Sequence, residues 1–119
     1  MNLTEARQAL ADALSTLDGV NVRLRQMKTP RALDGWTVSG TVVPDGYGDA
    51  QAQIGAVILL SPDPIKADEA FDGLALGIVE ATKAVDGGYD IRVDPATVNV
   101  EDGTPWNVIA VSISVEVQP

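Results

Sequence analysis

The chain has 119 residues, of which 45% are hydrophobic and 21% charged, so one globular domain over residues 1–119 is expected. It contains no cysteine and no histidine, which excludes disulfides, thiolate or imidazole metal ligands and a Ser-His-Asp triad. The net charge of −9 disfavours generic nucleic-acid binding, because affinity for phosphates needs a cationic surface.

The charge is distributed unevenly along the chain. Residues 1–35 carry five basic and four acidic side chains, whereas residues 36–119 carry three basic and thirteen acidic ones. Two interpretations stay open: head-to-tail contact between like subunits, or solubility alone. The longest apolar run, residues 56–60, is too short for a membrane span, and the first residues lack the pattern of a signal peptide. We therefore expect a water-soluble protein.

The first predicted element is an amphipathic helix. Asn2 is expected to cap it, Glu5 to complete a capping box, and Gly19 to end it as a left-handed residue. Its apolar stripe has helical spacing and consists of Leu3, Ala6, Leu10, Ala13, Leu14 and Leu17.

Three strands are predicted next, over residues 20–24, 36–43 and about 53–60. The first two alternate apolar and polar side chains, as half-buried strands do, and a long loop over residues 25–35 connects them. The third contains the uninterrupted run 56–60, which predicts burial on both faces in the middle of a sheet.

A second helix is expected after Asp63, which can cap it, with Pro64 at its first position and Gly87-Gly88 beyond its end. Three further strands are predicted over residues 89–93, 97–101 and 106–117, with a break at Asp94-Pro95.

Whether the loop of the last hairpin has an even or an odd number of residues decides which side chains share a face of the sheet. A loop with an even number of residues at Asp102-Gly103 would put Val98 and Val100 on the sheet face of Ile109 and the alternating aliphatic residues after it. We expect this arrangement. The order α-β-β-β-α-β-β-β then predicts an α+β domain, with a mixed, mainly antiparallel sheet and two helices packed on it.

No motif with a catalytic pattern is present. The turn around Tyr47 is glycine-rich, but no Gly-Lys-Ser/Thr follows it, so it is interpreted as a hairpin loop. Asp45 and Asp49 lack the spacing of a calcium loop, and acids early in the second helix are explained by the helix dipole. We expect no enzyme activity, no cofactor and no metal.

The only basic cluster consists of Arg23, Arg25, Lys28 and Arg31. The sequence places the first two on the solvent face of the first strand and the others on the following loop. The cluster is either a docking surface for an acidic neighbour or a solvated strand edge whose positive charges prevent aggregation by pairing with strands of other molecules. Trp36 and Trp106 open strands and are interpreted as core residues, although tryptophan is also a frequent interface anchor. Trp36 and Tyr47 join the four cations as candidate interface residues.

The order of elements resembles the tail terminator (tail completion) proteins of long, non-contractile-tailed bacteriophages. The resemblance covers nearly the whole chain but rests on element order and hydrophobic pattern, without an invariant motif. The residues that carry it are Leu10-Ala11-Asp12-Ala13-Leu14 leading into Asp18-Gly19-Val20, Trp36, the helix after Asp63-Pro64 and the strand Trp106-Asn107-Val108-Ile109-Ala110-Val111.

The resemblance implies a structural virion protein of the tail and neck, assembled in the host cytoplasm. It implies a homohexameric ring that caps the tail tube, stops its polymerisation and presents a surface to the head-side connector, or stopper, protein. DNA would pass through the lumen without specific binding, and no membrane would be involved. The alternatives are another phage neck component, such as a head–tail stopper or minor tail protein, and a non-viral, monomeric protein-binding module.

Overall fold

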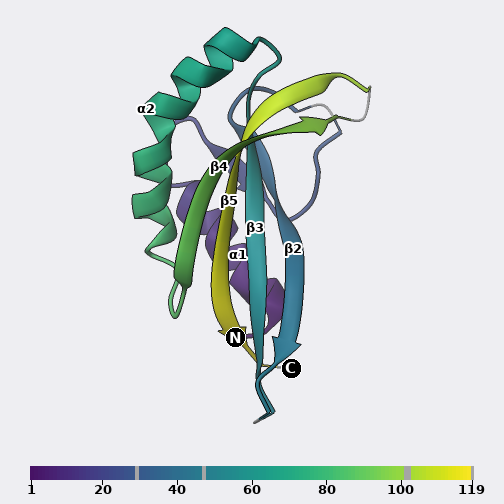
Figure 1. Cartoon of the computed structure of the whole chain (residues 1–119), viewed down its shortest axis with the longest axis vertical. Helices are drawn as coiled ribbons and strands as arrows, with labels where there is room; N and C mark the ends of the chain where they lie inside the picture. Colours follow the sequence, from purple (N-terminus) through teal and green to yellow (C-terminus); the bar gives the residue numbers. More distant parts are fainter. Residues whose placement is uncertain (29, 47, 101–102, 119) are drawn as a thin grey trace.

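The computed structural model describes residues 1–28, 30–46, 48–100 and 103–118 of a molecule measuring 46 × 28 × 19 Å (Figure 1). The described elements, in chain order, are α1 (Leu3–Leu14), β1 (Asn21–Arg23), β2 (Asp34–Pro44), β3 (Ala50–Ser61), α2 (Pro64–Thr82), β4 (Tyr89–Asn99) and β5 (Pro105–Val117).

The five strands form one sheet in the order β1-β2-β3-β5-β4. Only the β1–β2 pair is parallel, and the other three pairs are antiparallel. The predicted α+β class and the mixed, mainly antiparallel sheet are therefore confirmed. β3 lies at the centre of the sheet, as its uninterrupted apolar run predicted.

The predicted break at Asp94-Pro95 was wrong, because β4 continues through both residues and the described order is α-β-β-β-α-β-β. Pro95 pairs with Ile109 of β5 while β4 forms the edge of the sheet. A proline is tolerated on an edge strand because the hydrogen bond that it cannot donate would point away from the sheet.

The register predicted for the last hairpin was also wrong. The last paired residues before and after the turn are Asn99 and Pro105, so five residues separate them and the parity is odd. Val98 consequently lies opposite Trp106, and Val100 packs with Val108 on the other face of the sheet. Part of the turn, residues 101–102, lies outside the described residues.

Both helices pack on the same face of the sheet and close the main core. Asn2 and Glu5 form the predicted capping box of α1, and Asp63 caps α2 with Pro64 in its first turn. The buried residues contributed by the helices are Ala6, Leu10, Ala11, Leu14, Ala67 and Ile78. Those contributed by the two central strands are Ala52, Ile54, Ala56, Ile58, Leu60, Ile109, Val111, Ile113, Val115 and Val117.

Two boundaries near the start differ from the prediction. α1 ends at Leu14 with Ser15 as its C-cap, so Gly19, at φ 77°, forms the turn into β1 and does not cap the helix. β1 has three residues where five were expected. The Ser15 hydroxyl oxygen accepts a hydrogen bond from the Val22 N–H over 3.0 Å, which fixes the short strand against the end of the helix.

A second, smaller core lies on the face opposite the helices. Trp36, Leu59, Val100 and Val108 are buried there. The tryptophan is 8% exposed, which confirms its interpretation as a core residue. Farther along β2, Val38 and Val43 are 40% and 53% exposed, so part of this face is apolar and open to solvent.

Candidate subunit interface

The basic cluster occupies the end of β1 and the loop that joins β1 to β2. Here it is called the basic patch and consists of Arg23, Arg25, Lys28 and Arg31, all of them exposed. Arg23 belongs to β1, but Arg25 lies beyond its end, so the prediction that both share the strand face was wrong. The chain leaves the sheet at Leu24, whose carbonyl bonds to side chains and not to the neighbouring strand.

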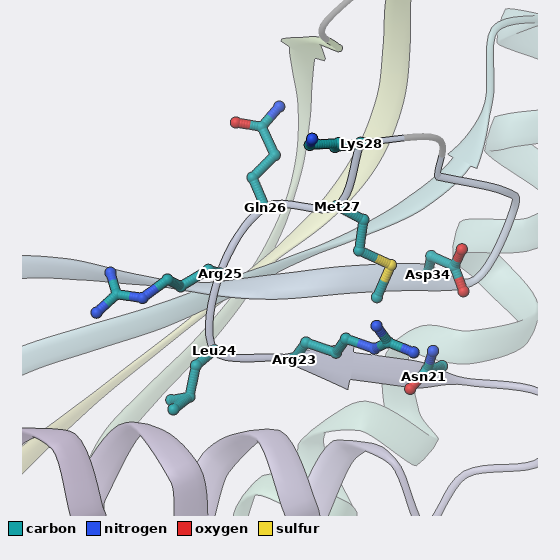
Figure 2. A pocket seen from close by; sticks show the side chains of 8 residues that line it. All are labelled: Asn21, Arg23, Leu24, Arg25, Gln26, Met27, Lys28 and Asp34. Carbon is teal, nitrogen blue, oxygen red and sulfur yellow. The ribbon is translucent and has the colours of Figure 1, made fainter.

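Three residues of the basic patch, Arg23, Arg25 and Lys28, line an open hollow of about 650 Å³ (Figure 2). In this view the Arg25 guanidinium points away from the other labelled side chains, whereas Arg23 extends toward Asn21. The complete lining consists of Asn21, Arg23, Leu24, Arg25, Gln26, Met27, Lys28 and Asp34. Arg31 lies outside the hollow, and its backbone N–H donates to Asp34 Oδ2 over 2.9 Å.

The backbone beside Arg25 is held by a partly buried hydrogen-bond network. Arg7 Nη2 of α1 and Thr37 Oγ1 of β2 each donate to the Leu24 carbonyl over 2.9 Å. At the other end of the loop, Leu33 N–H donates to the Leu59 carbonyl over 2.7 Å. Arg25 therefore projects from an anchored segment. The sequence pattern had not indicated this role of Arg7.

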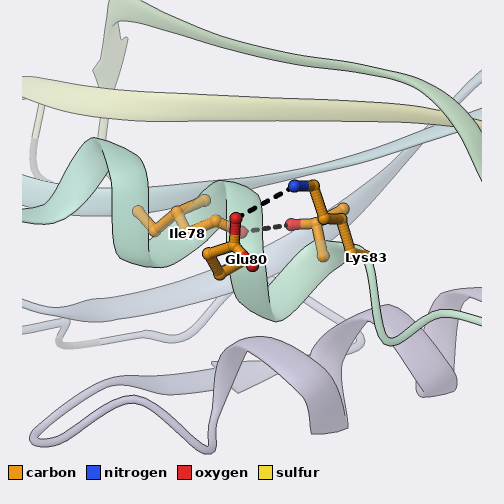
Figure 3. Close-up of polar contacts among 4 residues, drawn as sticks. Ile78, Glu80 and Lys83 are labelled. Carbon is orange, nitrogen blue, oxygen red and sulfur yellow. Dashed lines mark hydrogen bonds and ion pairs between the residues drawn. The ribbon is translucent and has the colours of Figure 1, made fainter.

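Among the described residues, no ion pair joins a cation of the basic patch to an acid of the same chain. In the ranges that the structure describes, the ion pairs are Lys83–Glu80 at 2.9 Å, shown in Figure 3, and Arg92–Asp90 at 3.8 Å. Both lie on α2 or β4, far from β1 in the strand order. The basic patch is consequently a mainly positive surface at one edge of the sheet, where Asp34 is the acid that lines the hollow without an ion pair to the cations in the described part of the chain.

A second charged surface, an acidic one, lies on α2, which packs across β3, β5 and the edge strand β4. α2 lies alongside β4, on the far side of the molecule from the β1–β2 loop (Figure 1). Its N-terminal half carries exposed Asp68, Glu69 and Asp72, with Asp63 just before the helix. The sequence pattern had explained the acids early in the helix by the helix dipole, and only the tertiary structure places Asp68 and Asp72 beside Pro95 and Ala96 of the edge strand β4.

A third charged group occupies the end of the sheet. Carboxylate oxygens of Asp45, Asp49 and Glu116 lie within 4.8 Å of one another, at the β2–β3 turn and the end of β5. A hydrogen bond between the Glu116 and Asp49 carboxyls, together with the negative charges of Asp49 and Asp45, raises the pKa of Glu116 above its ordinary value. Asp45 and Asp49 are close together in the sequence, whereas Glu116 is brought beside them only by the pairing of β5 with β3.

The remaining candidate interface residues are separated from the basic patch. Trp36 is buried in the second core and is not presented to solvent with the cations. Tyr47 lies outside the described residues. The structure therefore brings Arg23, Arg25 and Lys28 together around one hollow and leaves Arg31 at its margin.

Comparison with known protein families found no family model that matches the sequence, and no curated protein matches it either. Neither helix in the described part of the chain combines the length and the apolar character needed to cross a bilayer.

Proposed function

We propose that this chain is a structural protein of a phage virion, a tail terminator that forms a homohexameric ring. The ring caps the tail tube, stops its growth and contacts the head-side connector, while DNA passes through the lumen without specific recognition. In this proposal the chain has no catalytic role and binds no cofactor. The proposal rests on the resemblance in element order together with one structural observation: a basic patch at the edge strand β1 and acids of α2 beside the other edge strand, β4.

That observation supports a ring because ring closure needs two different surfaces on each subunit. In a heterologous interface, one patch of a subunit meets a different patch of the next, and a suitable rotation closes the assembly. The basic patch and the acidic side of α2 are two such surfaces, and each lacks a counter-ion for most of its charge among the described residues. Because these two surfaces lie apart on the molecule, one subunit can contact two neighbouring subunits at the same time.

Native mass spectrometry of the purified chain tests the assembly. A closed hexamer at low ionic strength is expected, with a ring and an open centre in negative-stain electron micrographs. The genes on either side test the biological assignment independently, because tail-tube and connector genes are expected there. A chain that stays monomeric, or neighbours without any virion role, would contradict the proposal.

A monomeric protein-binding module is the second candidate, and the open apolar part of β2 favours it. β1 pairs with only the first three residues of β2, so the half that carries Val38, Val42 and Val43 has no partner on that side within the described sheet. Exposed valines on a free edge are able to pair with a strand of another protein. Sedimentation separates the two candidates, since this one predicts a monomer.

A further inference from the structure

A hollow of about 300 Å³ lies between the N-terminal half of α2 and the strands β4 and β5. Its apolar lining includes Leu60, Phe71 and Val108, and Leu60 and Val108 are themselves almost fully buried. Asp68 and Asp72, four residues apart on α2, are exposed and also line it. The hollow thus combines an apolar floor with two carboxylates.

This combination fits one long cationic side chain. The hollow is at the small end of the roughly 300–1,000 Å³ typical of ligand pockets, so it suits a side chain better than a large ligand. An arginine buries its aliphatic stem against apolar surface and keeps its charged group at a carboxylate. The Phe71 ring adds a surface on which a guanidinium can stack.

The same chain carries a suitable arginine on its opposite edge. Arg25 is exposed, has no ion pair among the described residues and points away from the other side chains labelled in Figure 2. Its backbone is anchored through the Leu24 carbonyl, so little ordering of the loop is needed when it binds. It cannot reach the hollow of its own chain, because the whole sheet separates β1 from β4.

We propose that Arg25 of one copy inserts into the Asp68–Asp72 hollow of the next copy. The inference rests on the proposed ring and deepens it by naming the two surfaces that meet. Charge complementarity argues for a second copy as the occupant, because the chain supplies the cation just after the edge strand β1 and its acceptor between α2 and the other edge strand, β4. The contact is heterologous and leaves one unused surface at each end of an open chain of subunits.

Two variants, each lacking one surface, test the inference. Arg25→Gln removes the inserted cation, and Asp68→Asn/Asp72→Asn removes the acceptor, all at exposed positions that leave the core intact. Each variant alone is expected to weaken self-association by more than about tenfold. Mixed in equal amounts, they should form a one-to-one heterodimer that grows no further, because each retains the surface that the other lacks.

The control variants each remove one charge near one of the two surfaces but leave the contact. Arg31→Gln removes a cation of the same patch outside the hollow, and Glu69→Gln removes an acid of α2 that does not line it. Both should assemble like the unmodified chain in analytical ultracentrifugation and native mass spectrometry. Circular dichroism and thermal melts of every variant establish that it is folded.

The outcomes separate this inference from the proposed function. Rings that form equally well with Arg25→Gln and with the double variant would overturn the named contact and leave the ring proposal standing. A chain that is monomeric without any substitution would overturn both and assign the hollow to a different partner. A heterodimer from the mixture, with normal assembly of the controls, is the supporting result.

Discussion

Arg7 Nε donates a hydrogen bond to Thr37 Oγ1 over 3.0 Å, which joins α1 to β2 beneath the basic loop. Thr37 is 3% exposed, so the pair lies at the border of the core. Both side chains also donate to the Leu24 carbonyl, and this point fixes where the chain leaves β1. The candidate interface therefore depends on a contact between two residues that do not belong to it.

Arg7→Ala is expected to lower the free energy of unfolding by about 1–3 kcal/mol. Thr37 keeps its own bond to the Leu24 carbonyl, but the arginine bonds to Thr37 and Leu24 are lost. Urea denaturation measures the change. Gln8→Ala is the control, since exposed Gln8 bonds only to Asp12 one turn away and should change stability by less than about 0.5 kcal/mol. Equal effects of the two substitutions would contradict the anchoring role.

Ile78→Ala is expected to cost about 2–5 kcal/mol, because Ile78 is fully buried between α2 and the sheet and its loss leaves a cavity. Leu76, on the same helix, is 80% exposed, and Leu76→Ala should stay within about 0.5 kcal/mol of the unmodified chain. Chemical denaturation of both variants checks the contrast. A large effect at Leu76 in the monomer would refute the described helix orientation.

Gly55→Ala and Gly73→Ala should change stability in opposite directions. A Cβ at Gly55 would lie 2.6 Å from the Val111 carbonyl oxygen, so the central strands must shift, at a cost of about 1–3 kcal/mol. A Cβ at Gly73, within α2, meets nothing within 4 Å, and alanine there should stabilise the helix by about 0.5–1 kcal/mol. Thermal melts give both signs, and destabilisation by Gly73→Ala would be the unexpected result.

Glu116→Gln should stabilise the fold at neutral pH but not at low pH. The pKa of Glu116 is raised in the folded state by its hydrogen bond to Asp49 and by the charges of Asp49 and Asp45. The folded chain therefore holds this proton more tightly than the unfolded chain, and stability falls as pH rises from the ordinary value of 4.5 through the raised pKa. Glutamine removes the charge that causes the loss.

Melting temperatures between pH 4 and pH 8 test this prediction. The advantage of Glu116→Gln should appear as the pH rises above the ordinary glutamate value and should be absent at the acid end. Asp49→Asn provides the matched comparison: combining it with Glu116→Gln should add less than the sum of the single effects, because both remove the same repulsion. Fully additive effects would show that the two carboxyls do not interact.

Local sequence signals were sufficient for several elements. Asn2 and Glu5 predicted the start of α1, and Asp63-Pro64 predicted the start of α2. The apolar run 56–60 predicted the central strand. These signals are local because capping and hydrophobic periodicity act over a few residues. These signals predicted the α+β class, and the composition alone excluded histidine and thiol chemistry.

The tertiary structure decided what depends on distant neighbours. Pro95 does not break β4, because only the sheet order makes that strand an edge, and Val98 faces Trp106 because of a turn whose length the local pattern misjudged. The strand order likewise separates Arg25, just after the edge strand β1, from Asp68, beside the other edge strand, β4. Local propensity cannot encode which strand becomes an edge, since that is set by long-range pairing and packing.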